Sequence, residues 1–161
     1  MTLQVRGGAV TLAAMATTTD APLAAAERLA HAYGDAWNAH DIDTIMSLHA
    51  PGMTFHLHVE GFEEAATPEA VRGQFEAIFA AWPDLHFATT RLHVAPELVV
   101  HEFTINGTLA APWPIEGGAA QPTGRRIAFD GVDVLPLRDG LVARKDTYLD
   151  GLAYRAGLLE G

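Results

Sequence analysis

Apolar residues recur every three or four positions in three early segments of the chain, which is the spacing of amphipathic helices. The first helix is predicted to begin at Thr19–Pro22, where a capping side chain precedes a proline, with an apolar face of Leu29, Tyr33, Ala36 and Trp37. Asp41 is predicted to cap a second helix that carries Ile42, Ile45, Met46 and His49. A third helix opens at Thr67–Glu69, and its apolar face comprises Val71, Phe75, Ile78, Phe79 and Trp82.

Alternation with a period of two indicates strands in the other segments. Residues 54–59 alternate in this way, and longer strands are predicted over 86–94 and 98–109. Two more follow within 122–150, joined by a tight turn at Arg138–Gly140, and 152–159 is predicted to form a closing helix. Helices followed by a meander of strands predict an α+β domain. Three N-terminal helices would pack on a strongly curved antiparallel sheet and form a cone with an apolar interior.

Composition and charge narrow the function classes. The chain has 161 residues, 49% of them hydrophobic, which is enough for one domain with a substantial core. Its formal net charge of −10 argues against nucleic acid or an anionic membrane as partner, because phosphate groups recruit basic surfaces. The sequence contains no cysteine, which excludes disulfides and thiolate chemistry and fits the cytoplasmic location we expect.

The first 20 residues are rich in small side chains and differ from the rest. Ala14–Ala16 resembles a signal-peptide cleavage site, but only Arg6 is basic ahead of it. We expect residues 1–20 to form a disordered tail, or an over-long start that precedes Met15, and residues 21–161 to form the single domain.

Several segments in order carry a resemblance to a known family. Tyr33–Asp43 and Leu48–Phe55 resemble the opening helices of the NTF2-like (nuclear-transport-factor-2-like) superfamily. Four further segments resemble its SnoaL-like branch, which includes polyketide cyclases. They are Trp82–Phe87, Asn106–Thr108, Pro122–Arg125 and Gly131–Asp133. The resemblance implies the NTF2-like cone and a homodimer. It specifies function poorly, because this scaffold hosts isomerases, dehydratases, epoxide hydrolases, cyclases and plain binding proteins.

The catalytic positions of these relatives are only partly kept. Ketosteroid isomerases use a Tyr on the first helix, a protonated Asp on a later strand and an Asp base on the first strand. The resemblance places Tyr33 and Asp133 at the first two positions, but Leu57 at the base. Thr147 stands where cyclases and epoxide hydrolases have a catalytic Asp, and strand alternation turns the adjacent Asp146 outward. The remaining epoxide-hydrolase positions fall near residues 103 and 105, which are apolar.

Three residues are the candidates for catalysis. Asp133 lies among apolar neighbours, where a carboxyl group has a raised pKa and acts as an acid; the alternative is a structural ion pair with Arg125, Arg126 or Arg144. His101 is in phase with the inner face of its strand and is the candidate base, or else a core histidine. Tyr33 would donate a hydrogen bond to a substrate oxygen, or belong simply to the core.

The apolar residues of the inner face, with two polar ones, are expected to contact the substrate. The expected pocket residues are Trp37, Phe55, Leu57, Phe75, Phe79, Trp82, Phe103, Trp113, Lys145 and Thr147. Of these, Lys145 is expected to extend its amine to the rim. Residues 116–118 are expected to form a flexible lid. His56 and His58 share an outer face, but with no third ligand identifiable we expect no metal.

The leading hypothesis is an enzyme that acts without a cofactor on an apolar, oxygen-bearing small molecule such as a polyketide or terpenoid. It would catalyse cyclisation, isomerisation or dehydration, with His101 as base and Asp133 as its partner acid. The first alternative is a non-catalytic binding or dimerisation module. A third is epoxide opening, which requires Asp146 to face inward.

Overall fold

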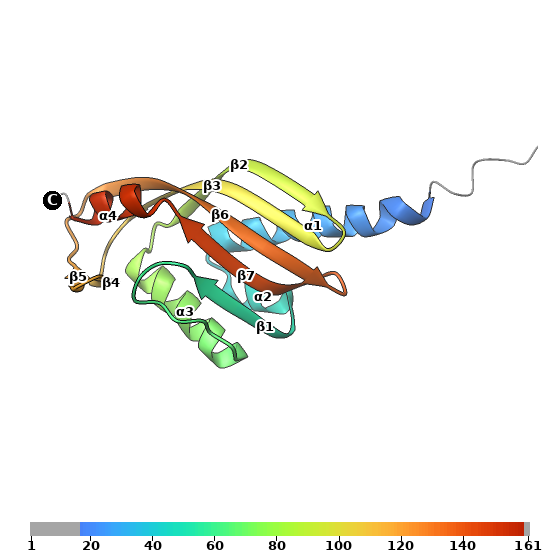
Figure 1. Ribbon diagram of the computed structural model, residues 1–161, viewed down its shortest axis with the longest axis horizontal. Helices are drawn as coiled ribbons and strands as arrows, with labels where there is room; N and C mark the ends of the chain where they lie inside the picture. The colour runs from blue at the N-terminus through green and yellow to red at the C-terminus, as the bar shows by residue number, and fades with distance from the viewer. Residues whose placement is uncertain (1–16, 160–161) are drawn as a thin grey trace, which may run out of the picture.

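The computed structural model describes residues 17–159, and the predicted tail therefore lies largely outside the described residues. The helices are α1 (Thr17–Asn38), α2 (Ile42–Ser47), α3 (Pro68–Ala81) and α4 (Gly151–Leu159). The strands are β1 (His49–Leu57), β2 (His86–Ala95), β3 (Leu98–Thr108), β4 (Trp113–Ile115), β5 (Gly118–Ala120), β6 (Arg126–Arg138) and β7 (Leu141–Leu149). These elements form the α+β cone expected from the sequence, with helices packed on a curved sheet (Figure 1).

The predicted capping residues begin two of the helices. The Asp41 carboxylate accepts the Thr44 backbone N–H at 3.0 Å at the start of α2, and the Thr67 hydroxyl accepts that of Ala70 at 3.2 Å at the start of α3. The prediction that α2 carries His49 was wrong. The helix ends at Ser47, and His49 is the first residue of β1, where it lies opposite Val142 of β7.

The main sheet has five strands in the order β1-β7-β6-β3-β2. The β6–β7 hairpin has the predicted tight turn, in which Asp139 and Gly140 adopt φ angles of 54° and 74°, as expected for a two-residue connection. The sheet is antiparallel except at one edge, where β1 pairs with β7 in parallel. This pairing is possible because α3 and β2 to β6 lie between the two strands in sequence and supply the long crossover.

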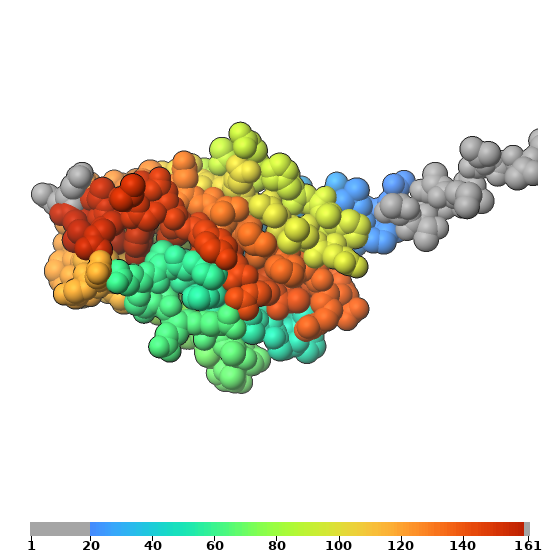
Figure 2. Space-filling view, in the orientation of Figure 1, coloured from blue at the N-terminus to red at the C-terminus, as the bar shows by residue number. Residues whose placement is uncertain are grey.

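The helices cover one face of the sheet. Helix α1 packs against β2 and β3, α3 packs against β1, and α2 contacts both helices, while α4 packs on β6 (Figure 1). The first described turns of α1 project beyond the body of the molecule (Figure 2). No helix within residues 17–159 is both long and apolar enough to cross a membrane.

Glu116 and Gly117 form the turn of a small β4–β5 hairpin, and Gly118 is the first residue of β5. Residues 116–118 were predicted to form a flexible lid. Two contacts attach this hairpin to α4. The buried Trp113 indole N–H donates to the Tyr154 hydroxyl, and Arg155 pairs with Glu116 at 3.1 Å. The hairpin is therefore held against α4.

Gly131 packs closely against the core and against the neighbouring strand. A Cβ atom there would lie 2.6 Å from the Phe103 ring and 2.9 Å from the backbone oxygen of Tyr148. Because backbone cannot yield as a flexible side chain does, we expect Gly131→Ala to lower the free energy of unfolding by about 1–3 kcal/mol. Urea denaturation measures this loss. Gly73→Ala, on an open surface of α3, is the control, and equal stability of the two variants would contradict the packing described here.

Candidate active site

A row of side chains crosses all five strands on the inner face of the sheet. Leu57 of β1, Thr147 of β7, Asp133 of β6, His101 of β3 and Leu92 of β2 lie opposite one another on successive strands. The middle three are polar and buried. The pairing thus places the candidate base and the candidate acid side by side, as their shared strand phase had made possible.

Asp133 forms a buried ion pair with Lys145. The Lys145 ammonium donates to Asp133 Oδ2, and the Thr147 hydroxyl donates to Oδ1 at 2.6 Å. Asp133 and Lys145 are 4% and 2% exposed, so water screens this pair very little. Two expectations were wrong: the partner of Asp133 is not an arginine, and Lys145 does not extend to the rim. The alternation of β7 turns Lys145 inward and Arg144 outward, where Arg144 binds Asp146 and Glu64.

Two aromatic rings lie beside the Lys145 ammonium. Its nitrogen lies 4.9 Å from the centre of the Trp37 ring and 6.0 Å from that of Tyr33. Burial lowers the pKa of Lys145, because a desolvated ammonium is costly, and Asp133 opposes that shift. The cation is therefore held by one carboxylate and by the faces of two rings.

His101 lies beside the Asp133–Lys145 pair. Within the described residues, it forms no hydrogen bond to either member of the pair. Its Nε2 atom is 2.8 Å from the Thr89 hydroxyl of β2. Burial lowers the pKa of His101; nearby Asp133 opposes this shift and Lys145 adds to it. The imidazole is consequently neutral at physiological pH, and its lone pair lies on Nδ1 in the tautomer whose Nε2–H donates to Thr89.

Tyr33 reaches a histidine that the sequence had placed on a helix. Its hydroxyl lies 2.9 Å from Nε2 of His49, and burial raises the pKa of Tyr33 well above its usual range. Burial and the Lys145 charge lower the pKa of His49 to about 4. No local signal marked this contact, because the register of β1 shifts between His49 and Thr54 and breaks the alternation that would have revealed it.

Two cavities lie between the helices and the sheet. The larger one, here the α1 cavity, has a volume of about 340 Å³, and its walls include Tyr33, Trp37, Thr89, His101 and Asp133. The smaller one, the α3 cavity, has a volume of about 50 Å³ and a largely apolar wall that includes Lys145 and Thr147. Trp37 and Phe87 line both cavities. The Asp133–Lys145 pair therefore reaches from one cavity to the other.

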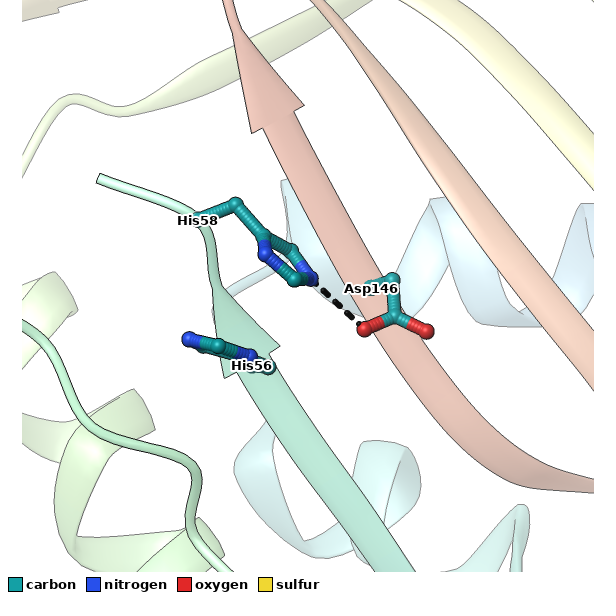
Figure 3. A group of neighbouring side chains, drawn as sticks. All are labelled: His56, His58 and Asp146. Atoms are coloured by element: carbon teal, nitrogen blue, oxygen red, sulfur yellow. Dashed lines mark hydrogen bonds and ion pairs between the residues drawn. The ribbon is translucent and has the colours of Figure 1, made fainter.

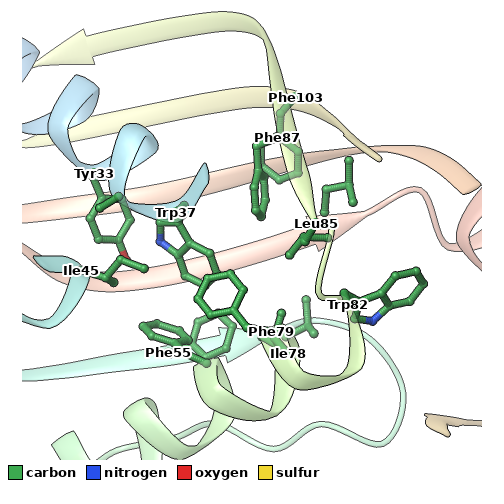
Figure 4. Packing of buried hydrophobic residues seen from close by; sticks show 14 of the residues in the cluster. Tyr33, Trp37, Ile45, Phe55, Ile78, Phe79, Trp82, Leu85, Phe87 and Phe103 are labelled. Atoms are coloured by element: carbon green, nitrogen blue, oxygen red, sulfur yellow. The ribbon is translucent and has the colours of Figure 1, made fainter. Parts of the chain in front are cut away.

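The predicted pocket residues divide between cavity and core. The α3 cavity is lined by Trp37, Phe55, Leu57, Trp82, Trp113, Lys145 and Thr147. Phe75, Phe79 and Phe103, also predicted to line a pocket, are in the wall of neither cavity. They pack in the core, and Figure 4 shows Phe79 beside Trp37 and Phe103 beside Phe87. Three residues of α1 that were not predicted, His31, Asp35 and Asn38, also line the α1 cavity.

Two buried nitrogen atoms, one of them on a side chain that lines both cavities, lack a hydrogen-bond partner among residues 17–159. They are Nε1 of Trp37 and Nδ1 of His49. A buried donor without a partner is costly and rare in folded proteins. A ligand oxygen near Trp37 would satisfy its N–H, which makes that atom a candidate substrate contact.

The helices, the curved sheet and the two cavities between them define a small α+β cone domain. Residues 30–145 match the model of the SnoaL-like domain, and the chain belongs to that family. The sequence has no significant match among curated proteins.

Solved structures share the fold at low sequence identity. A candidate SnoaL-like polyketide cyclase from Jannaschia sp. CCS1 superposes with a TM-score of 0.73 at 18% identity, covering 86% of this chain and 94% of that one. AclR from Streptomyces galilaeus, described as a candidate hydroxylase, gives 0.69 at 22% identity over 86% and 83%. IdmH from Streptomyces antibioticus, described as a candidate polyketide cyclase, gives 0.66 at 22% identity over 82% and 96%.

Proposed function

We propose that this protein is an enzyme that performs acid/base chemistry, without a cofactor, on an apolar, oxygen-bearing small molecule such as a polyketide or terpenoid. The reaction class is cyclisation, isomerisation or dehydration. The observation that carries the proposal is that the buried side chains of His101, Asp133 and Tyr33 line one cavity, with His101 and Asp133 directly opposite each other on neighbouring strands. Membership in the SnoaL-like family agrees with it.

His101 is the proposed base. When its Nε2–H donates to Thr89, the lone pair on Nδ1 is free to accept a substrate proton. The negative charge of Asp133 then stabilises the imidazolium that forms. His101 can afterwards return the proton to another atom of the substrate, as isomerisation and dehydration both require.

Asp133 takes a different role from the neutral acid expected from the sequence. Both of its carboxylate oxygens accept hydrogen bonds, from an ammonium and from a hydroxyl. A carboxylate held in this way is suited to be a fixed negative charge beside His101. We therefore assign Asp133 as a positioning and electrostatic residue, with Lys145 and Thr147 as its supports.

Tyr33 and Trp37 are the proposed donors to a substrate oxygen. The Tyr33 hydroxyl is free to donate in the tautomer in which the Nε2–H of His49 is the donor between them. The Trp37 N–H has no other partner among the described residues and belongs to a side chain in the same cavity wall. Together these donors would polarise a carbonyl group and acidify the adjacent carbon for His101.

The pH profile of turnover tests this assignment. A base must be unprotonated, so kcat/KM should fall as the pH drops through the pKa of His101 and should be constant above it. Because burial lowers that pKa, the acidic limb should lie below the ordinary histidine value of 6.5. Turnover of polyketide-class ketones from pH 4 to 8 measures the profile, after assays have confirmed that the protein stays folded over this range. A limb that His101→Gln leaves unchanged would contradict the role of His101.

The homodimer implied by the family resemblance is also part of the proposal. Sedimentation at micromolar concentration should show a dimer, and a monomer there would refute it.

A further inference from the structure

Three potential metal ligands gather on the outer face of the sheet, away from both cavities. They are His56 of β1, His58, which directly follows the last residue of β1, and Asp146 of β7, and one ligand atom from each lies within 4.8 Å of the others (Figure 3). His56 lies directly opposite Asp146 in the parallel β1–β7 pair. His58 Nε2 already contacts Asp146 Oδ1 at 2.8 Å. All three side chains are half-buried.

The arrangement suits a borderline divalent cation. Side chains two residues apart in extended backbone point to the same face, and the ring centres of His56 and His58 are 3.8 Å apart. Ligands of a tetrahedral zinc ion are roughly 3–3.5 Å apart, since zinc binds nitrogen and carboxylate oxygen at about 2.0–2.2 Å. The three ligand atoms lie within 4.8 Å of one another, so side-chain shifts of about 1–2 Å bring them to the spacing that zinc needs. Imidazole and carboxylate together suit zinc better than calcium or magnesium.

Neighbouring groups both support and oppose a cation here. His58 stacks on Tyr148 with 4.1 Å between ring centres, which fixes its orientation. Arg144 competes, because its Nε and Nη2 atoms donate to Asp146 at 2.6 and 2.8 Å. Arg144 is itself bound by Glu64 at 2.7 Å and donates to Thr54 at 3.0 Å, so its charge is partly balanced.

We propose that His56, His58 and Asp146 bind one divalent transition-metal ion, zinc being the best match, at a surface site separate from the candidate active site. From the sequence, only His56 and His58 could be identified as ligands of this site. The third comes from the parallel pairing of β1 with β7, which places Asp146 opposite His56. A fourth position remains open to water or to another ligand.

Zinc titration of the full chain by calorimetry at neutral pH tests the site. We expect one zinc ion per chain, and His56→Gln and His58→Gln should each weaken binding at least about tenfold. His93→Gln should leave binding unchanged, because His93 is an exposed histidine of β2 that pairs with Glu102. Thermal melts without metal establish that each variant is folded.

Arg144→Gln provides a test in the opposite direction. Removing the guanidinium frees the Asp146 carboxylate and removes a positive charge, so zinc should bind more tightly than in the wild type. Binding only at millimolar zinc would overturn the proposal. So would several equivalent ions per chain, or a loss in His93→Gln as large as that in His56→Gln.

Discussion

Replacing Lys145 with methionine is expected to lower the free energy of unfolding by about 3–5 kcal/mol. Methionine fills a similar volume but leaves the Asp133 carboxylate buried, with Thr147 as its only remaining hydrogen-bond donor. An uncompensated charge in a site that is 4% exposed has almost no access to water. Urea denaturation monitored by tryptophan fluorescence measures the loss.

A double variant separates the charge from the packing. Adding Asp133→Asn to Lys145→Met removes the stranded charge and keeps an acceptor for Thr147, so much of the stability should return. Arg126→Met is the matched control, because Arg126 forms an exposed pair with Asp84 at 2.8 Å and should contribute only about 0–1 kcal/mol. Equal small losses in Lys145→Met and Arg126→Met would show that the buried pair does not stabilise the fold.

His101→Gln is expected to lower turnover of the substrate by roughly 10²- to 10⁴-fold, the range that a positioned acid/base group contributes. Glutamine keeps a hydrogen-bonding group for Thr89 but cannot accept a proton near neutral pH. The loss should therefore be in kcat, with KM changed much less. His93→Gln, the exposed histidine on the neighbouring strand, should retain wild-type activity.

Local patterns in the sequence predicted much of this architecture. The capping residues Asp41 and Thr67 begin their helices, and the Asp139–Gly140 turn joins β6 to β7. Strand alternation also predicted that Thr147 faces inward and Asp146 outward, because the period of two holds along this part of β7. With Asp146 outward, the condition that the epoxide-opening hypothesis required is not met.

Pairing between distant strands accounts for what the sequence could not predict. The partner of Asp133 depends on which basic residue the β6–β7 register brings inward, and the candidates named from the sequence were all arginines. The third ligand of the proposed metal site depends on the parallel β1–β7 pairing. The position of His49 depends on a register shift within β1. None of these features leaves a periodic signal in the residues near it.

Chemical rescue of His101→Ala tests whether His101 is the base. His101→Ala removes the imidazole from the wall of the α1 cavity and leaves space for a free imidazole molecule beside Asp133. The measurement is the turnover of a polyketide-class ketone by this variant as imidazole is added. We expect very low turnover by His101→Ala without imidazole. Its turnover should rise with the imidazole concentration, with no such rise in the wild type. Turnover by His101→Ala equal to that of the wild type, with no imidazole present, would show that His101 is not the base.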